Sequence, residues 1–205
     1  MNKTICSIFA MLTLGMSQVT LATEKYIAGK DYTVLKSQVK TDHPAKIEVR
    51  EFFTYSCSHC FALESQLQPW LKKGLAKDIY FIRTPAAMNP IWEQNARGYY
   101  VSEVLGIRQK VHLQLFENIQ LKRQPLFDQQ KLSQFYAKYG VNSFQFNQLY
   151  NSPAITGKIN ISNQLAKKYQ LTGVPAIAIN GKYLIQGEHE HMADIIEYLI
   201  QKERI

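Results

Sequence analysis

The sequence predicts an α/β fold into which a long helical segment is inserted, and three observations lead to this prediction. An apolar run, residues 47–55, is followed directly by a helical pattern, with two cysteines at the junction. Two further apolar runs, 176–179 and 182–185, flank an Asn-Gly dipeptide that is typical of a β-hairpin. Between these regions, residues 90–152 keep helical spacing with no interrupting strand pattern.

The chain begins with the features of an export signal. Lys3 supplies a positive charge, residues 5–16 form an apolar core, and residues 20–22 (Thr-Leu-Ala) resemble a cleavage site. The apolar core is too short for a stable membrane span. We therefore expect residues 1–22 to be a signal peptide that is removed together with Cys6, an uncleaved anchor being the alternative.

Composition argues against a nucleic-acid partner. The formal charge is +8, but the basic residues are scattered and form no run longer than pairs such as Lys72-Lys73. A basic stripe with interleaved aromatic side chains, the pattern typical of nucleic-acid binding, is not present in the sequence. The charges are expected to lie on solvated faces.

The first two predicted strands differ in character. Residues 26–35 read as a turn that leads into a short strand, and residues 47–54 read as a longer, buried strand. Glu51 is a carboxylate inside this apolar run. It either faces water at a sheet edge, or it is a buried acid beneath the cysteines that moves protons to and from Cys60.

The cysteine pair Cys57-Ser58-His59-Cys60 lies where the strand gives way to a helix, the setting in which C-x-x-C reads as a redox pair. A helix N-terminus presents unpaired N–H groups and the positive end of the peptide dipole, so it stabilises a thiolate at Cys57. His59 adds a positive charge when it is protonated. A low thiolate pKa would make the disulfide oxidising.

Three other interpretations of the pair remain. A structural disulfide would close a loop too short to stabilise much. A zinc site needs about four ligands, and there is no second cysteine pair. A chance occurrence of the motif is the third.

The elements that follow are read from periodicity. The helix after Cys60 is expected to reach Leu75, with Pro69 kinking or breaking it. Residues 79–83 read as a strand apolar enough to be central in the sheet. Residues 159–171 and 192–200 read as two more helices.

The segment Glu188-His189-Glu190-His191 precedes the last of these helices. It could hold a metal ion, but a polar helix start with acids near the N-terminus is the preferred interpretation.

Pro175 opens the first strand of the predicted hairpin, where a proline is confined to a strand start or a turn. At this point the chain resembles the thioredoxin superfamily, and within it the DsbA-like thiol:disulfide oxidoreductases. Members carry a cis proline, preceded by valine in DsbA, that packs against the redox cysteines, and Val174-Pro175 matches this pattern. The resemblance implies that Val174 and Pro175 contact substrate backbone; a trans-proline turn is the alternative.

The resemblance extends to three charged residues. Glu51 stands where relatives have a buried glutamate, six residues before the first cysteine, which favours a proton-transfer role for it. Glu64 matches a further acidic position, with an exposed glutamate on a helix face as the alternative, and Arg83 falls where relatives carry a lysine that pairs with the buried glutamate. Ser58 departs from the family, since DsbA proteins commonly have proline there.

The resemblance also implies an organisation and a function. The chain would have a thioredoxin fold, residues 23–87 and 156–205, with an inserted all-helical domain, residues 88–155. The protein would be a periplasmic dithiol oxidase that donates its Cys57-Cys60 disulfide to reduced, newly exported polypeptides. It would need no cofactor beyond that disulfide and would be reoxidised by a quinone-linked membrane protein of the DsbB type. A disulfide reductase or isomerase, or a non-catalytic peptide-binding chaperone, remain as alternatives.

Overall fold

The computed structural model describes residues 25–187 and 189–205. The signal peptide expected over residues 1–22 lies outside the described residues. None of the helices in the described part of the chain is long and apolar enough to cross a membrane.

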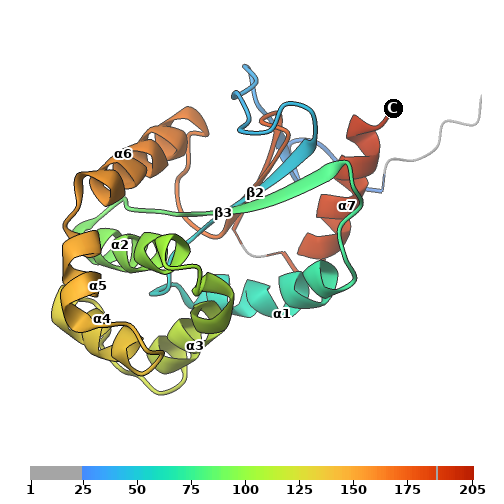
Figure 1. Cartoon of the computed structure of the whole chain (residues 1–205). Helices are drawn as coiled ribbons and strands as arrows, with labels where there is room; N and C mark the ends of the chain where they lie inside the picture. The colour runs from blue at the N-terminus through green and yellow to red at the C-terminus, as the bar shows by residue number, and fades with distance from the viewer. Residues whose placement is uncertain (1–24, 188) are drawn as a thin grey trace, which may run out of the picture.

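A five-stranded mixed sheet forms the centre of the molecule, in the order β1-β5-β4-β2-β3. β2 and β3 are parallel (Figure 1). β4 is antiparallel to β2 and to β5, and β1 is antiparallel to β5. The strands span β1 Thr33–Val34, β2 Ile47–Phe53, β3 Ile79–Pro85, β4 Ala176–Ile179 and β5 Tyr183–Gln186.

Seven helices accompany the sheet in the described residues. They are α1 Ser58–Lys72, α2 Pro90–Val104, α3 Arg108–Gln120, α4 Gln129–Ala137, α5 Ser143–Tyr150, α6 Pro153–Lys168 and α7 Met192–Glu203. Side-chain caps explain where several begin: Asn89 and Ser152 each accept a hydrogen bond from an amide of the first turn, and a proline follows each of them.

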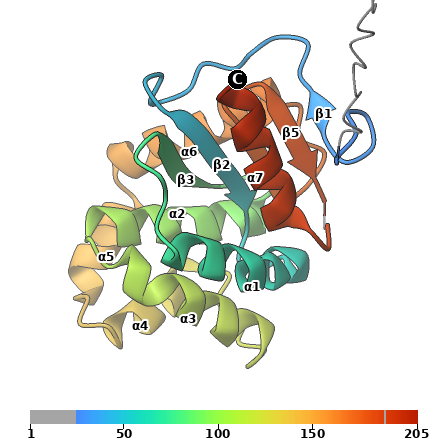
Figure 2. The same ribbon diagram turned by 90° about the vertical axis from the view of Figure 1, so that its right-hand side faces the viewer.

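The two faces of the sheet are covered by different helices. Figure 2 shows α7 in front of the sheet and α6 behind it. Val49 and Ile177 of the sheet pack with apolar side chains of α1 and α7 in one buried cluster. Phe52 and Ala178, on the opposite face, pack with Tyr169, just after α6.

A third buried cluster belongs to the helical region and meets the sheet at one end. It unites side chains of α2 to α6 with Phe53, Tyr55 and Cys60. The end of β2 and the first turn of α1, which carry the cysteine motif, therefore lie between the sheet and the helical region (Figure 1).

The predicted α/β fold with a helical segment is confirmed, with three corrections. β3 is an edge strand and not a central one, because an apolar pattern reports burial and not lateral position: Phe81 of β3 is covered by Trp70 of α1. α1 passes through Pro69 and ends at Lys72, where Gly74, with φ of 83°, terminates it. The helix expected from residue 159 begins earlier, at Pro153.

The hairpin between β4 and β5 turns at the predicted dipeptide. Asn180 and Gly181 have φ values of 50° and 66°, the positive values that the type I′ turn favoured by Asn-Gly in a β-hairpin requires. A Cβ atom on Gly181 would lie 1.9 Å from the carbonyl oxygen of Val39, whose own N–H donates to the Gly181 oxygen at 2.7 Å. Glycine is therefore needed here for the conformation and for the close approach of the N-terminal segment.

Candidate active site

Cys57 caps the N-terminus of α1. Its backbone is extended, and its Sγ accepts a hydrogen bond from the amide of Cys60 at 3.3 Å. Cys57 is half-buried, while Cys60 on the first turn is fully buried. The predicted position of the cysteine pair, at the junction between a strand and a helix, is thus confirmed. Both cysteines are free thiols in this structure.

The surroundings separate the acidities of the two thiols. A hydrogen bond from the Cys60 side chain, backbone N–H groups of Cys60 and His59, and the charge of His59 together lower the pKa of Cys57 to about 6, against the effect of burial. Burial and the neighbouring Cys57 raise the pKa of Cys60 far above its usual range. At neutral pH Cys57 is a thiolate, and Cys60 holds its proton.

The loop before β4 lies against the cysteine pair. The Val174-Pro175 peptide bond is cis, as the family resemblance implied. The Cys57 Sγ lies 3.4 Å from the carbonyl oxygen of Val174 and, as a thiol, donates to it. Ser58 and His59 are exposed beside this contact, on the first turn of α1.

Glu51 is fully buried, which excludes the interpretation of an exposed edge residue. The register of β2 and β3 places it opposite Arg83, whose Nε lies 2.7 Å from Glu51 Oε2. The N–H of this nitrogen is not aligned for a hydrogen bond, and within the described residues neither Glu51 oxygen has a hydrogen-bond partner. Burial outweighs the attraction of Arg83 and raises the pKa of Glu51 to about 8.

Glu51 is electrostatically linked to Cys60, because the negative charge of Glu51 contributes to the raised pKa of that thiol. Each group therefore disfavours ionisation of the other. Glu51 and Cys60 are therefore a coupled pair in which ionisation of both groups at once is disfavoured.

Glu64 is also buried, so the alternative of an exposed glutamate is wrong. Arg83 Nη2 donates to its two oxygens at 2.9 and 3.1 Å, and Gln68 Nε2 donates at 2.6 Å. Burial would raise the pKa of this carboxyl, but a hydrogen bond with His112 and the charges around it lower the pKa to about 2. Glu64 is thus ionised where Glu51 is not.

His112 of α3 is the member of the site that sequence reasoning missed. Its Nε2 lies 2.9 Å from Glu64 Oε1, and its Nδ1 lies 2.9 Å from the hydroxyl oxygen of Tyr55. A hydrophilic residue beside the apolar stripe Val111-Leu115-Ile119 was the available signal, but nothing in the sequence indicates a partner on α1.

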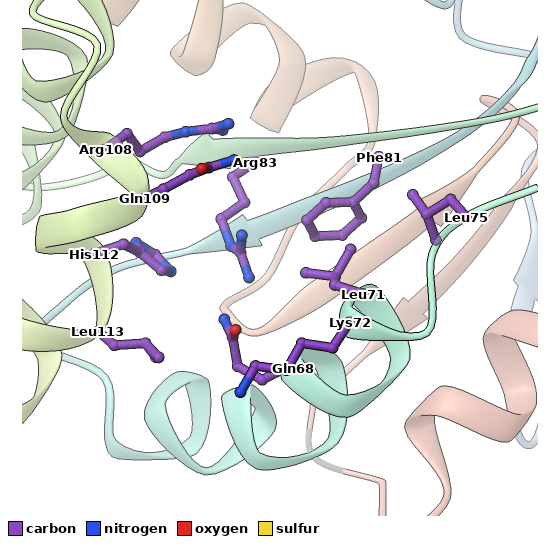
Figure 3. Close-up of a pocket in the computed structure, with 10 residues that line it drawn as sticks. All are labelled: Gln68, Leu71, Lys72, Leu75, Phe81, Arg83, Arg108, Gln109, His112 and Leu113. Atoms are coloured by element: carbon purple, nitrogen blue, oxygen red, sulfur yellow. The ribbon is translucent and has the colours of Figure 1, made fainter.

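A cavity of about 430 Å³ lies beside this charged group, between α1, β3 and α3. Figure 3 shows Arg83 reaching from β3 toward α1, with His112 on the adjacent turn of α3 and Gln68 on the opposite wall. Arg83 and His112, which contact the buried carboxylates, thus also line this cavity.

In the described part of the chain, no group of three or more His, Cys, Asp or Glu side chains is placed to hold a metal ion. The segment considered above as a possible metal site includes Glu188, which is outside the described residues.

Comparison with known proteins agrees with this geometry. A model of the DSBA-like thioredoxin domain matches residues 76–196. The thiol:disulfide interchange protein DsbA of Pseudomonas aeruginosa is 37% identical over 208 residues, covering 99% of this chain and 97% of the relative. DsbA of Pseudomonas syringae pv. tomato is 38% identical over 202 residues, covering 97% and 93%.

Solved structures show the same architecture. The crystal structure of Pseudomonas aeruginosa DsbA matches with a TM-score of 0.81 and 38% identity, covering 87% of this chain and 95% of that one. The oxidoreductase DsbA from Xylella fastidiosa matches with a TM-score of 0.81 and 33% identity, covering 87% and 98%. The chain therefore belongs to the DsbA family of thiol:disulfide oxidoreductases, with a thioredoxin fold that carries a helical insertion.

Proposed function

We propose that Cys57 and Cys60 are the redox centre with which this protein oxidises pairs of thiols in exported polypeptides. The observation that carries the proposal is the asymmetry of the pair: a stabilised, half-exposed Cys57 thiolate at the N-terminus of α1 beside a buried Cys60. A stabilised thiolate is a good leaving group, and its stability favours the reduced form of the protein.

Two exchange steps transfer two electrons. A substrate thiolate attacks the Cys57 sulfur of the disulfide, the Cys57–Cys60 bond breaks, and Cys60 leaves and takes up a proton. The second substrate thiolate then attacks the substrate sulfur of the mixed disulfide, and Cys57 leaves as a thiolate. The substrate thiols are oxidised to a disulfide, and the protein is reduced to the dithiol.

Glu51 is proposed to carry the proton for Cys60. A pKa of about 8 leaves this buried carboxyl protonated at neutral pH, so it can protonate the departing Cys60 thiolate. In the reverse step, when the disulfide is re-formed, the ionised carboxylate takes the proton back. Glu51 is thus an acid–base group and not a nucleophile.

The rim of the site is proposed to handle the substrate. Val174 and Pro175 would lie along substrate backbone, which is supported by the contact of the Val174 carbonyl with Cys57. His59 supplies positive charge near the thiolate. Ser58 offers a backbone N–H and a hydroxyl, both of which a proline at this position would lack, so it adds two donors near Cys57.

The domain division is proposed along the buried clusters. Residues 23–87 and 156–205 would form the thioredoxin-fold domain, and residues 88–155 the inserted helical domain. The separate clusters on the sheet and among the helices support this division. α6, Pro153–Lys168, crosses the second boundary and packs with both parts.

The cellular setting follows from the family. We place the protein in the periplasm, exported through residues 1–22, with reduced exported proteins as substrates and no nucleic-acid partner. Its disulfide would serve in place of any separate cofactor, and a DsbB-type, quinone-linked membrane oxidase would re-form it. The resemblance to DsbA proteins over 99% of the chain supports this setting.

The test is oxidation of a reduced peptide that contains two cysteines. The oxidised protein should convert one equivalent of peptide to its disulfide, and Cys57→Ser should lose this activity completely. Full activity in Cys57→Ser would refute the assignment. Peptide binding that persists in a Cys57→Ala/Cys60→Ala double variant, together with an inactive parent, would instead identify a peptide-binding chaperone.

A further inference from the structure

His112 connects the helical insertion to the acid–base group of the redox site. It lies on α3, away from the strand and helix that carry the cysteines, yet it is only 4% exposed. Both ring nitrogens are engaged, Nε2 with Glu64 and Nδ1 with the hydroxyl of Tyr55, each at 2.9 Å. The rings of Phe53 and Phe116 pack edge-on against the imidazole.

The protons in this chain of contacts have fixed positions. Burial lowers the pKa of His112 to about 4, so the ring is neutral at neutral pH. Ionised Glu64 can only accept, so Nε2 of His112 carries the ring proton and donates it. Burial raises the pKa of Tyr55, so its hydroxyl keeps its proton and donates to Nδ1.

Glu64 and Glu51 both pair with the guanidinium of Arg83, but only Glu64 has further hydrogen-bond donors. Glu64 accepts aligned hydrogen bonds from Arg83, Gln68 and His112. Glu51 faces Arg83 Nε at 2.7 Å but has no aligned donor in the described residues. Two like charges this close cannot both be ionised cheaply, so the carboxyl with more donors keeps the negative charge.

We propose that His112 is a positioning residue for the exchange reaction: by donating to Glu64 it holds the negative charge there and keeps Arg83 divided between the two carboxyls, which leaves Glu51 as the proton carrier for Cys60. This inference rests on the proposed role of Glu51 as proton carrier. It adds the interaction, His112 with Glu64, that determines which of the two carboxyls takes that role. The hydrogen bonds of His112 go to Glu64 and Tyr55 and not to either cysteine, so His112 acts through Glu64 and Arg83.

The expected direction of the effect depends on every charged or titratable group around the two carboxyls. These groups are Tyr55 after β2, Cys57 and Cys60 at α1, Arg83 on β3, Tyr99 on α2, and Arg108 and His112 on α3. Without the His112 donor, the charge on Glu64 is less stable, so its pKa rises. Glu64 nevertheless stays ionised near pH 8, because Arg83 and Gln68 still stabilise its charge, and it then draws more strongly on Arg83. Glu51 is left with a smaller share of Arg83 beside an unchanged negative neighbour, so the pKa of Glu51 rises.

The experiment follows the step in which Cys60 must give up its proton. Glutathione is attached to Cys57 as a mixed disulfide; Cys60 attacks the Cys57 sulfur, its proton passes to Glu51, and glutathione leaves as a thiolate. The rate of glutathione release should rise with pH through an inflection near 8, where Glu51 ionises. In His112→Phe the inflection should move to higher pH, by about one unit or less, because Glu51 keeps a smaller share of Arg83.

Companion variants separate this effect from a structural one. Glu64→Gln removes the negative neighbour of Glu51 and should move the inflection in the opposite direction, to lower pH. Adding His112→Phe to Glu64→Gln should then shift it no further. His112→Gln, which keeps an amide donor, should restore part of the original position. Tyr136→Phe is the matched control, because it breaks a buried 2.8 Å hydrogen bond to Gly98 in the same cluster without touching the carboxyls, and it should leave the inflection in place.

Two failures are distinguishable. If Glu51→Gln keeps the inflection, Glu51 is not the proton carrier, and the proposed proton transfer between Glu51 and Cys60 is refuted. If Glu51→Gln removes the inflection but a folded His112→Phe leaves it unmoved, the inference about His112 is overturned. Should His112→Phe not fold, an unmoved inflection in Glu64→Gln overturns it equally.

Discussion

At the scale of single residues, two pairs of like groups are driven apart in acidity by their surroundings. Cys57 and Cys60 are separated by two residues, but only Cys57 receives donors at the helix N-terminus, while Cys60 is buried. Glu51 and Glu64 share Arg83, but only Glu64 has further donors. In each pair one member is ionised and the other is protonated. Thiol–disulfide exchange needs both states, a stable thiolate as leaving group and a proton for the second sulfur.

The raised pKa of Glu51 predicts a stability that depends on pH. In the folded dithiol the pKa is about 8, above the ordinary value of 4.5, so the folded state binds more protons than the unfolded state between these values. Stability contributed by this group is therefore full below about pH 4.5 and is lost as pH rises toward 8.

Glu51→Gln removes this loss, because the amide cannot ionise. We expect the reduced variant to be more stable than the reduced parent, by on the order of 4 kcal/mol at pH 8 and on the order of 1 kcal/mol at pH 5. Urea unfolding at the two pH values measures this. A variant that is less stable than the parent at pH 8 would show that the Arg83–Glu51 pair stabilises the fold more than burial of the carboxylate costs.

At the scale of elements, short segments between strands and helices place the reacting groups. The end of β2 delivers the cysteines to the cap of α1, and the loop before β4 brings Val174 to Cys57. The β4–β5 turn is locked to the N-terminal segment through Gly181 and Val39.

Gly181→Ala tests how tightly this turn is packed. The new Cβ would meet backbone 1.9 Å away, which only a backbone movement can relieve, in addition to the strain of a positive φ. We expect a loss of about 3 kcal/mol or more in the free energy of unfolding. Gly29→Ala is the control: it has φ of 84° but open space around it, and it should cost only about 1 kcal/mol. Equal losses in the two variants would mean that the contact with Val39 is not limiting.

At the scale of the whole molecule, what the sequence could predict depended on distance along the chain. The strand-to-helix handover at Cys57, the Asn180-Gly181 turn and the apolar stripe of α7 are local patterns, and each is confirmed. Family resemblance supplied the cis bond before Pro175 and the pairing of Arg83 with Glu51.

Other features that depend on contacts between remote segments could not be predicted from local sequence patterns. The edge position of β3 follows from which strands pair, and the partner of His112 lies 48 residues earlier in the chain. Burial of Glu64 is decided by α3 packing over α1, whereas the sequence shows only a glutamate on a helix. The chemistry of the site thus combines a locally encoded cysteine motif with charges that the tertiary fold brings together.

The measurement that tests the central claim most directly is the reduction potential of the Cys57–Cys60 disulfide against glutathione as a function of pH. We predict a disulfide more oxidising than the glutathione pool, with a slope that changes from about 60 to about 30 mV per pH unit as pH rises through about 6, where the Cys57 thiol ionises. A potential near that of thioredoxin, about −270 mV, with no change of slope near pH 6, would contradict the account and identify a reductant.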